Sequence, residues 1–134
     1  MFLFKLKYWY ILSYYIIKQG GITLKIECKK QNKNLIVKLY GEIDHHFTED
    51  IRDKIDREFK KQNCNNIILD FEDINFMDSS GIGMIIGRYK LIKEKNGKIY
   101  AFGLKDNAKR IFNMSGLNKL ITCFDTKEEA LKNI

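Results

Sequence analysis

Two adjacent serines follow an aspartate in residues 75–83, which read NFMDSSGIG. This segment comes directly after the apolar run 67–71 and before a long amphipathic stretch, so we expect a strand, a tight loop and the first turn of a helix. Serine hydroxyls at such a position could act as nucleophiles, as ligands of an anion or as acceptors of a phosphate. The surrounding residues separate these three chemistries.

The sequence lacks the motif residues that an enzymatic role for these serines would require. A nucleophile elbow has the pattern G-x-S-x-G, and neither Ser79 nor Ser80 has a glycine two positions before it. The one Gly-Lys pair, at 97–98, lacks the glycine five positions earlier that a phosphate-binding loop requires. A lone G-x-G at 81–83 is too weak to indicate dinucleotide binding. A small hydrolase that uses Ser80 is the one enzyme alternative, and we expect no cofactor.

A capped helix is the simplest structural interpretation, with Asp78 as the N-cap. It leaves Gly81, Gly83 and Gly87 unexplained, because each glycine in a helix is unfavourable by roughly 0.8–1 kcal/mol relative to alanine. The capped-helix interpretation also does not explain why the apolar Ile82 stands in a first turn that is otherwise expected to be exposed. A helix start with few side chains and one apolar residue is typical of a surface that another protein approaches closely.

A phosphate at this helix start would act as a switch. Phosphoserine adds roughly −1.5 to −2 charges, and the amides and dipole of a helix N-terminus tolerate them. The neighbouring Asp78 repels the phosphate, and a partner packed here would lose complementarity. The fold would survive while partner binding changes. The residues alone leave Ser79 and Ser80 both open as the modified serine.

Composition and charge argue against several other classes of function. The chain has 134 residues and a net charge of +7, of which residues 1–21 contribute +3. The remaining basic residues are interleaved with acids, which indicates a solvated surface rather than a nucleic-acid interface. The three cysteines are far apart and form no CxxC pair, so we expect reduced thiols in a cytoplasmic protein. His45 and His46 would point to opposite faces if extended, so we expect no metal site.

Residues 1–21 differ in character from the rest of the chain. Their uncharged run spans only residues 8–17, short of the roughly 20 residues of a membrane-spanning helix. Gly20-Gly21 could be a ribosome-binding sequence read as protein, with Leu24 as a start codon. We therefore expect residues 1–21 to be an extension, produced by an over-extended gene start or, as the weaker alternative, attached to a membrane surface. The domain proper is expected at residues 22–134.

The expected positions of strands and helices follow from hydrophobic periodicity and capping residues. We expect strands at 22–28, 35–40, 67–71, 98–104 and around 121–123. We expect helices that begin near Thr48, Asp78, Asp106 and Thr126, each of which is a candidate N-cap. The first helix carries an apolar stripe of Phe47, Ile51, Ile55 and Phe59. The order predicts an α/β domain with a mixed, mostly parallel sheet of four to five strands, an antiparallel edge hairpin and about four helices.

Four separated motifs in this order resemble the anti-sigma factor antagonists, whose shared fold is the STAS domain. They are GEIDHH at 41–46, FMDSSGIG at 76–83, GRYK at 87–90 and FNMSGL at 112–117. The resemblance covers residues 22–134, and the His-His pair and GRYK favour the sporulation type of the sigma-F system. A STAS scaffold, or a stress-response partner-switching module with a different kinase, is the alternative.

The resemblance implies a non-enzymatic regulator that switches partners. Its unphosphorylated form would bind an anti-sigma factor and free the sigma factor. That partner is itself a serine kinase, bringing its own ATP or ADP, and would phosphorylate the serine directly after the aspartate, Ser79. A serine phosphatase would reverse the modification. The resemblance also implies a partner-binding surface, with no membrane or direct nucleic-acid partner; its residues are Asp44, Met77, Asp78, Ser80, Gly81, Ile82 and Gly83.

Overall fold

The structure is a computed structural model, and it describes residues 11–134. Its strands are β1 (Ile11–Gln19), β2 (Ile22–Gln31), β3 (Asn34–Ile43), β4 (Asn66–Met77), β5 (Ile99–Phe102) and β6 (Thr122–Phe124). Its helices are α2 (Thr48–Lys61), α3 (Ser79–Lys93), α4 (Asp106–Ser115) and α5 (Lys127–Lys132), with a 3₁₀ turn, η1 (Leu117–Lys119). Within the described range no helix is long and apolar enough to cross a membrane.

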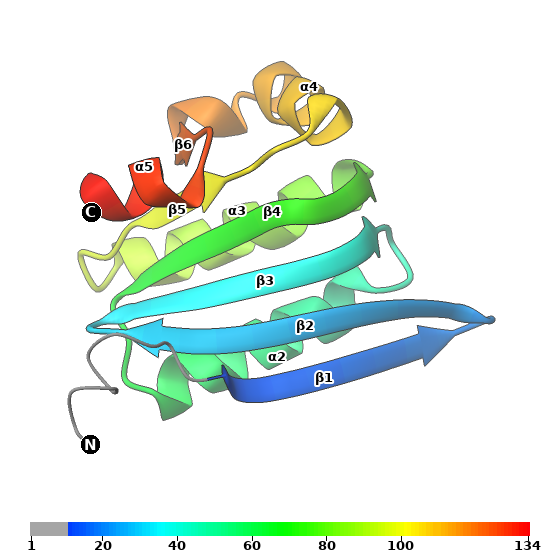
Figure 1. Cartoon of the computed structure of the whole chain (residues 1–134), viewed down its shortest axis with the longest axis horizontal. Helices are drawn as coiled ribbons and strands as arrows, with labels where there is room; N and C mark the ends of the chain where they lie inside the picture. The colour runs from blue at the N-terminus through cyan, green and yellow to red at the C-terminus, as the bar shows by residue number, and fades with distance from the viewer. Residues whose placement is uncertain (1–10) are drawn as a thin grey trace.

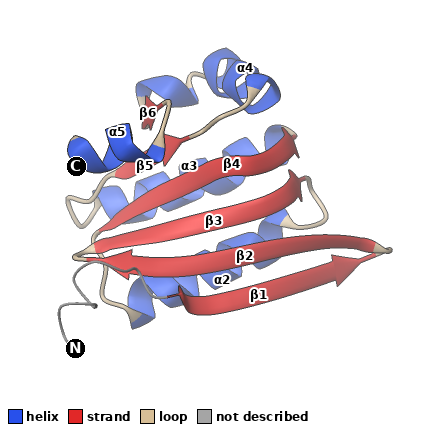
Figure 2. Cartoon of the chain, viewed as in Figure 1, coloured by secondary structure: helices blue, strands red, loops and turns tan. Residues whose placement is uncertain are grey.

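The six strands form one sheet in the order β1-β2-β3-β4-β5-β6 (Figures 1 and 2). β1, β2 and β3 are antiparallel neighbours, whereas β3, β4, β5 and β6 run parallel. The predicted mixed α/β fold with an antiparallel hairpin and four α-helices is confirmed in the described residues. The sheet has one strand more than expected, because β1 comes from the segment that we placed outside the domain.

β1 is the edge strand, and it pairs with β2 from Ile11 opposite Lys29 to Gln19 opposite Ile22, with a shift of register between Ile11 and Ser13. Gly20 and Gly21 form the turn between them, both with positive φ. The boundary expected between the extension and the domain, at residue 22, falls at the start of β2, and β1 on its other side belongs to the same sheet. Residues 1–10 of the expected extension lie outside the described residues. The idea that residues 1–21 are not translated stays a prediction.

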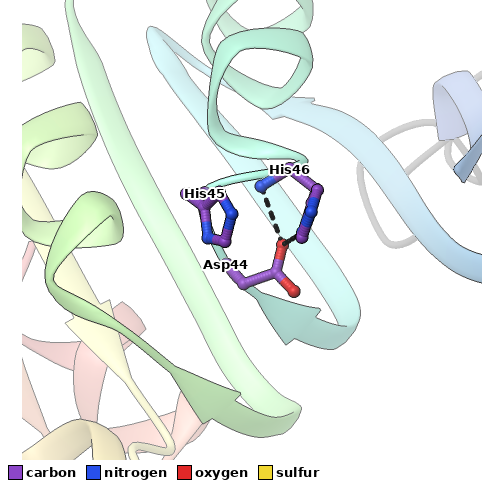
Figure 3. Close-up of side chains that lie close together, drawn as sticks. All are labelled: Asp44, His45 and His46. Carbon is purple, nitrogen blue, oxygen red and sulfur yellow. Dashed lines mark hydrogen bonds and ion pairs between the residues drawn. The ribbon is translucent and has the colours of Figure 1, made fainter.

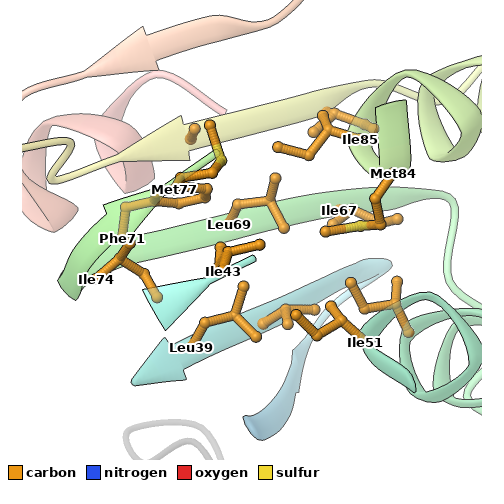
Figure 4. Close-up of a cluster of buried hydrophobic side chains, with 14 of the residues drawn as sticks. Leu39, Ile43, Ile51, Ile67, Leu69, Phe71, Ile74, Met77, Met84 and Ile85 are labelled. Atoms are coloured by element: carbon orange, nitrogen blue, oxygen red, sulfur yellow. The ribbon is translucent and has the colours of Figure 1, made fainter. Parts of the chain in front are cut away.

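The core lies between the sheet and the layer of helices α2 and α3 (Figures 1 and 4), and α4 adds the buried Ala108 and Phe112 to it. Side chains alternate along β3, so Leu35 and Val37 face this layer while Ile36 faces the other side with Ile68 of β4. α5 covers that other side near β5, through the buried Ala130. The predicted stripe of the first helix is buried, which confirms its orientation; its residues are Phe47, Ile51, Ile55 and Phe59.

Two of the four predicted N-caps are wrong by one residue. Thr48 and Asp106 are the first residues of their helices, and the preceding N-cap residues make no side-chain cap bond. Before α2, a backbone turn supplies the bond instead, because the amide of Thr48 donates to the carbonyl oxygen of Asp44 at 3.3 Å. Asp78 and Thr126 are confirmed as caps, each accepting a hydrogen bond from a backbone amide.

Candidate functional site

The site lies at the edge of the sheet where β3 and β4 end. The two strands are parallel and Ile43 pairs with Met77, so Asp44 and Asp78 follow at the same edge. The amide of Asp78 donates to the carbonyl oxygen of Ile43 at 3.0 Å, which continues the strand pairing. β4 runs through Met77, so the predicted loop is wrong: Asp78 alone separates the strand from α3.

The carboxylate of Asp78 joins three groups from two segments. Its Oδ1 accepts from the amide of Ser80 at 2.9 Å and from the Ser80 hydroxyl, and its Oδ2 accepts from the amide of His45 at 3.2 Å. Partial burial by itself raises the pKa of Asp78, but these hydrogen bonds outweigh it and the net pKa lies below the ordinary 3.8. The carboxylate is therefore ionised at neutral pH, directly before Ser79.

The two serines have different surroundings. Ser79 is the first residue of α3 and is exposed, and its hydroxyl has no hydrogen-bond partner among the described residues. Ser80 is half-buried, and its hydroxyl donates to the Asp78 carboxylate. A kinase could reach the Ser79 hydroxyl without breaking an existing bond. Phosphorylation of Ser80 would remove a contact that holds the helix cap.

The segment after β3 turns instead of continuing extended. The amide of His46 donates to Oδ1 of Asp44 at 2.9 Å, and the two imidazole rings lie with their centroids 4.0 Å apart (Figure 3). The expectation that His45 and His46 point to opposite faces is therefore wrong. The turn brings their side chains and the Asp44 carboxylate to one place.

The residues expected to bind a partner divide into buried and accessible groups. Met77 is fully buried, and a Cβ atom on Gly81 would lie 2.6 Å from its Cγ, so packing inside the domain requires this glycine. Ile82 is only 8% exposed, so the expectation of an exposed apolar residue is wrong: it faces the core beside Ile85. Gly83 is exposed, and a Cβ atom there would meet no other atom within 4 Å.

A groove of about 370 Å³ runs between α2 and α3 beside Ser80. The α2 side is formed by Thr48, Glu49 and Arg52, and the α3 side by Ser80, Gly83, Met84, Gly87 and Arg88. Sequence patterns do not predict this groove, because it depends on how the two helices pack. The one available signal was Arg88, a cation on the inner face of an apolar helix.

Arg88 ties the two helices together beneath the groove. Its side chain is 10% exposed, and its Nε lies 2.8 Å from Oδ1 of Asp56 in α2. Burial lowers the pKa of Arg88 and raises that of Asp56, while the attraction between them opposes both changes. The ion pair therefore links α2 and α3 beside the groove.

Comparison with known proteins gives consistent results. The STAS domain family profile matches residues 25–130. An anti-sigma F factor antagonist of Paenibacillus polymyxa is 37% identical over 113 residues, which cover 84% of this chain and 97% of that protein. The structure of the anti-sigma factor antagonist SpoIIAA in its unphosphorylated form has a TM-score of 0.68 and 27% identity, over 90% of this chain and 95% of that one. The structure of the Bacillus cell fate determinant SpoIIAA in the phosphorylated form has a TM-score of 0.62 at 27% identity, over 90% and 98%.

Proposed function

Since the chain belongs to the STAS domain family, among its anti-sigma factor antagonists, we propose that it acts by switching partners in the control of a sporulation sigma factor of the sigma-F type. In its unphosphorylated form it binds an anti-sigma factor that is also a serine kinase, and this binding frees the sigma factor. The kinase, with bound ATP, phosphorylates Ser79 and ends the interaction. A serine phosphatase restores the active form in the cytoplasm.

The exposed Ser79 hydroxyl carries this proposal. It lies at the first position of α3, next to the ionised Asp78, while Ser80 is engaged in the helix cap. The first turn of α3 contains no acidic side chain, so the positive end of the helix dipole favours a phosphate there. A solved relative with 27% identity is described in a phosphorylated form, which agrees with a phosphate on this fold.

The accessible part of the site provides the partner-binding surface. Asp44, Asp78, Ser79 and Gly83 lie along one edge, and the groove between α2 and α3 extends from it. Met77, Gly81 and Ile82 support this surface from within, because all three are buried. A partner segment seated across this edge would meet a phosphate on Ser79 directly.

Incubation with ATP, Mg²⁺ and the anti-sigma factor kinase from the same genome tests the proposal. We expect mass spectrometry to find one phosphate, on Ser79. The matched variants are Ser79→Ala, which should accept none, and Ser80→Ala, which should still be phosphorylated at Ser79. A phosphate on Ser80, or full phosphorylation of the Ser79→Ala variant, would contradict the assignment.

The sigma-F assignment has a separate test. Binding of the unphosphorylated chain is measured against the sporulation kinase and against a stress-response kinase of the same organism, each with ADP. We expect at least tenfold tighter binding to the sporulation kinase. Equal or tighter binding to the stress-response kinase would favour the alternative module while leaving the Ser79 switch intact.

A further inference from the structure

We infer that Asp44, His45 and His46 form a binding site for one divalent transition-metal ion, of the class that accepts imidazole nitrogen, such as Zn²⁺ or Co²⁺. Each residue offers a ligand atom, and these atoms all lie within 4.8 Å of one another (Figure 3). Two imidazoles and a carboxylate are a ligand set that suits zinc and its neighbours and does not suit Mg²⁺ or Ca²⁺.

The distances require little rearrangement. Nδ1 of His46 lies 3.3 Å from Oδ1 of Asp44, which is about the separation of two ligands in a tetrahedral site with bonds of about 2.0–2.1 Å. The imidazole of His45 must approach further to complete the set. Both histidine side chains have room to move toward the ion, because His45 is 70% exposed and His46 is 54% exposed.

The carboxylates around the imidazoles are already held in place. Oδ1 of Asp44 accepts from the His46 amide at 2.9 Å, so the turn itself orients the ligand. Oδ2 of Asp78 lies 3.7 Å from Nδ1 of His45 and adds a second negative charge beside the cluster. The two carboxylates beside the imidazoles make this edge favourable for a cation. The fourth coordination position is left for water or for Asp78.

Metal binding here does not depend on the proposed function, because it needs only residues of this chain. With Asp78 as its fourth ligand, the ion would also join the turn after β3 to the start of α3. Loss of metal binding would leave the phosphorylation experiment unaffected.

Calorimetric titration of the full, metal-free chain with Zn²⁺ tests the site, together with the visible absorption of its Co²⁺ complex. We expect one ion per chain and a tetrahedral or five-coordinate Co²⁺ spectrum. His45→Gln and His46→Gln should each weaken binding by roughly tenfold or more. In NMR spectra, Zn²⁺ should shift the signals of residues 44–46 first.

Two control variants test whether Zn²⁺ binds at residues 44–46 rather than at another side chain. Asp44→Asn should weaken Zn²⁺ binding, because it removes the carboxylate ligand. Glu42→Gln removes the same charge from an exposed neighbouring position and should bind Zn²⁺ as the parent chain does. Cys123→Ser removes the exposed thiol and should also leave binding unchanged. The site is ruled out if the double variant His45→Gln/His46→Gln binds Zn²⁺ with unchanged affinity. It is also ruled out if Cys123→Ser abolishes binding, or if one ion binds only between two chains.

Discussion

Asp78 connects the ends of two parallel strands to the start of a helix through a single carboxylate. It caps α3 through the Ser80 amide and holds the turn after β3 through the His45 amide. Each of these acceptor contacts is made to an ionised group, which strengthens it. The accessible position of Ser79 and the shape of the neighbouring turn therefore depend on the same side chain.

Replacement of Asp78 by asparagine keeps a capping oxygen but removes the charge. We expect the free energy of unfolding to fall by about 1 kcal/mol at pH 7. Because the folded-state pKa of Asp78 lies below its unfolded value, its contribution is fully present above pH 3.8 and is lost as the pH falls through the folded pKa. Urea unfolding at pH 7 and at pH 3 should therefore show a difference between parent and variant that is smaller at pH 3. A difference of equal size at both pH values would contradict this account.

The glycines of α3 serve two different purposes. A Cβ atom on Gly81 would press into Met77, whereas Cβ atoms on Gly83 and Gly87 would meet no atom within 4 Å. Gly83 and Gly87 lie one turn apart and both line the groove towards α2. Packing within the domain does not require them, so their small size leaves room for a partner.

Alanine at Gly87 should stabilise the fold and weaken partner binding. We expect the free energy of unfolding to rise by about 0.5–1 kcal/mol, because alanine is the better helix former and finds open space. Binding to the anti-sigma factor should weaken, because the methyl group occupies the groove. Gly81→Ala is the matched control within the same helix, and overpacking against Met77 should destabilise it by about 1–3 kcal/mol. Denaturant unfolding and calorimetric binding measure both; unchanged partner binding by Gly87→Ala would exclude the groove from the interface.

β1 contributes a polar contact to the core side of α2. The hydroxyl of Tyr15 donates to Oε1 of Glu58 at 3.1 Å, and Glu58 is only 1% exposed. Burial, together with this bond to Glu58, raises the pKa of Tyr15, so the phenol stays protonated and remains a donor. A buried carboxylate in α2 thus depends on a donor from the edge strand.

Tyr15→Phe should destabilise the domain by about 1–2 kcal/mol, because it leaves the buried Glu58 without one of its donors. Tyr14→Phe is the matched control. Tyr14 lies on the opposite face of β1 and is exposed, so its change should stay within about 0.5 kcal/mol. Urea unfolding of both variants gives the comparison, and equal effects would show that β1 is not tied to α2 through Tyr15.

Intact mass of the natively expressed protein tests separately whether residues 1–21 are translated.

In the molecule as a whole, the proposed phosphorylation of Ser79 changes the partner-binding surface and leaves the hydrophobic core unchanged. Ser79 is exposed, and the residues that pack beneath it belong to one continuous hydrophobic cluster. Negative charge at the first position of α3 interacts favourably with the helix dipole. Phosphorylation should therefore act through charge and bulk at the interface rather than through unfolding.

Ser79→Glu tests this separation of stability from binding. We expect its melting temperature to equal or slightly exceed that of the parent, because a first-turn glutamate contributes about 0.3–1 kcal/mol. Its affinity for the anti-sigma factor should fall at least tenfold. Ser79→Ala should bind as the parent does, which shows that the hydroxyl itself is dispensable. A Ser79→Glu variant that melts far below the parent would mean that the charge disrupts the fold.

Local patterns in the sequence determined most of the elements and the capped start of α3. Periodicity and capping depend on neighbouring residues, so they predicted the β2–β3 hairpin, the stripe of α2 and the role of Asp78. The four motifs at residues 41–46, 76–83, 87–90 and 112–117 added the family resemblance and, through it, the choice of Ser79 over Ser80. The place of β1 in the sheet was missed, because its pairing with β2 and its contact with Glu58 are not visible in composition.

Only the tertiary structure decided which site residues are accessible. Met77, Gly81 and Ile82 belong to the same motif as Ser79, yet they are buried, because α3 packs directly against the end of β4. The groove between α2 and α3 and the cluster at residues 44–46 arise where separate elements or a turn bring side chains together. Spacing along the chain alone does not decide such contacts, because they depend on how elements pack and how a turn folds.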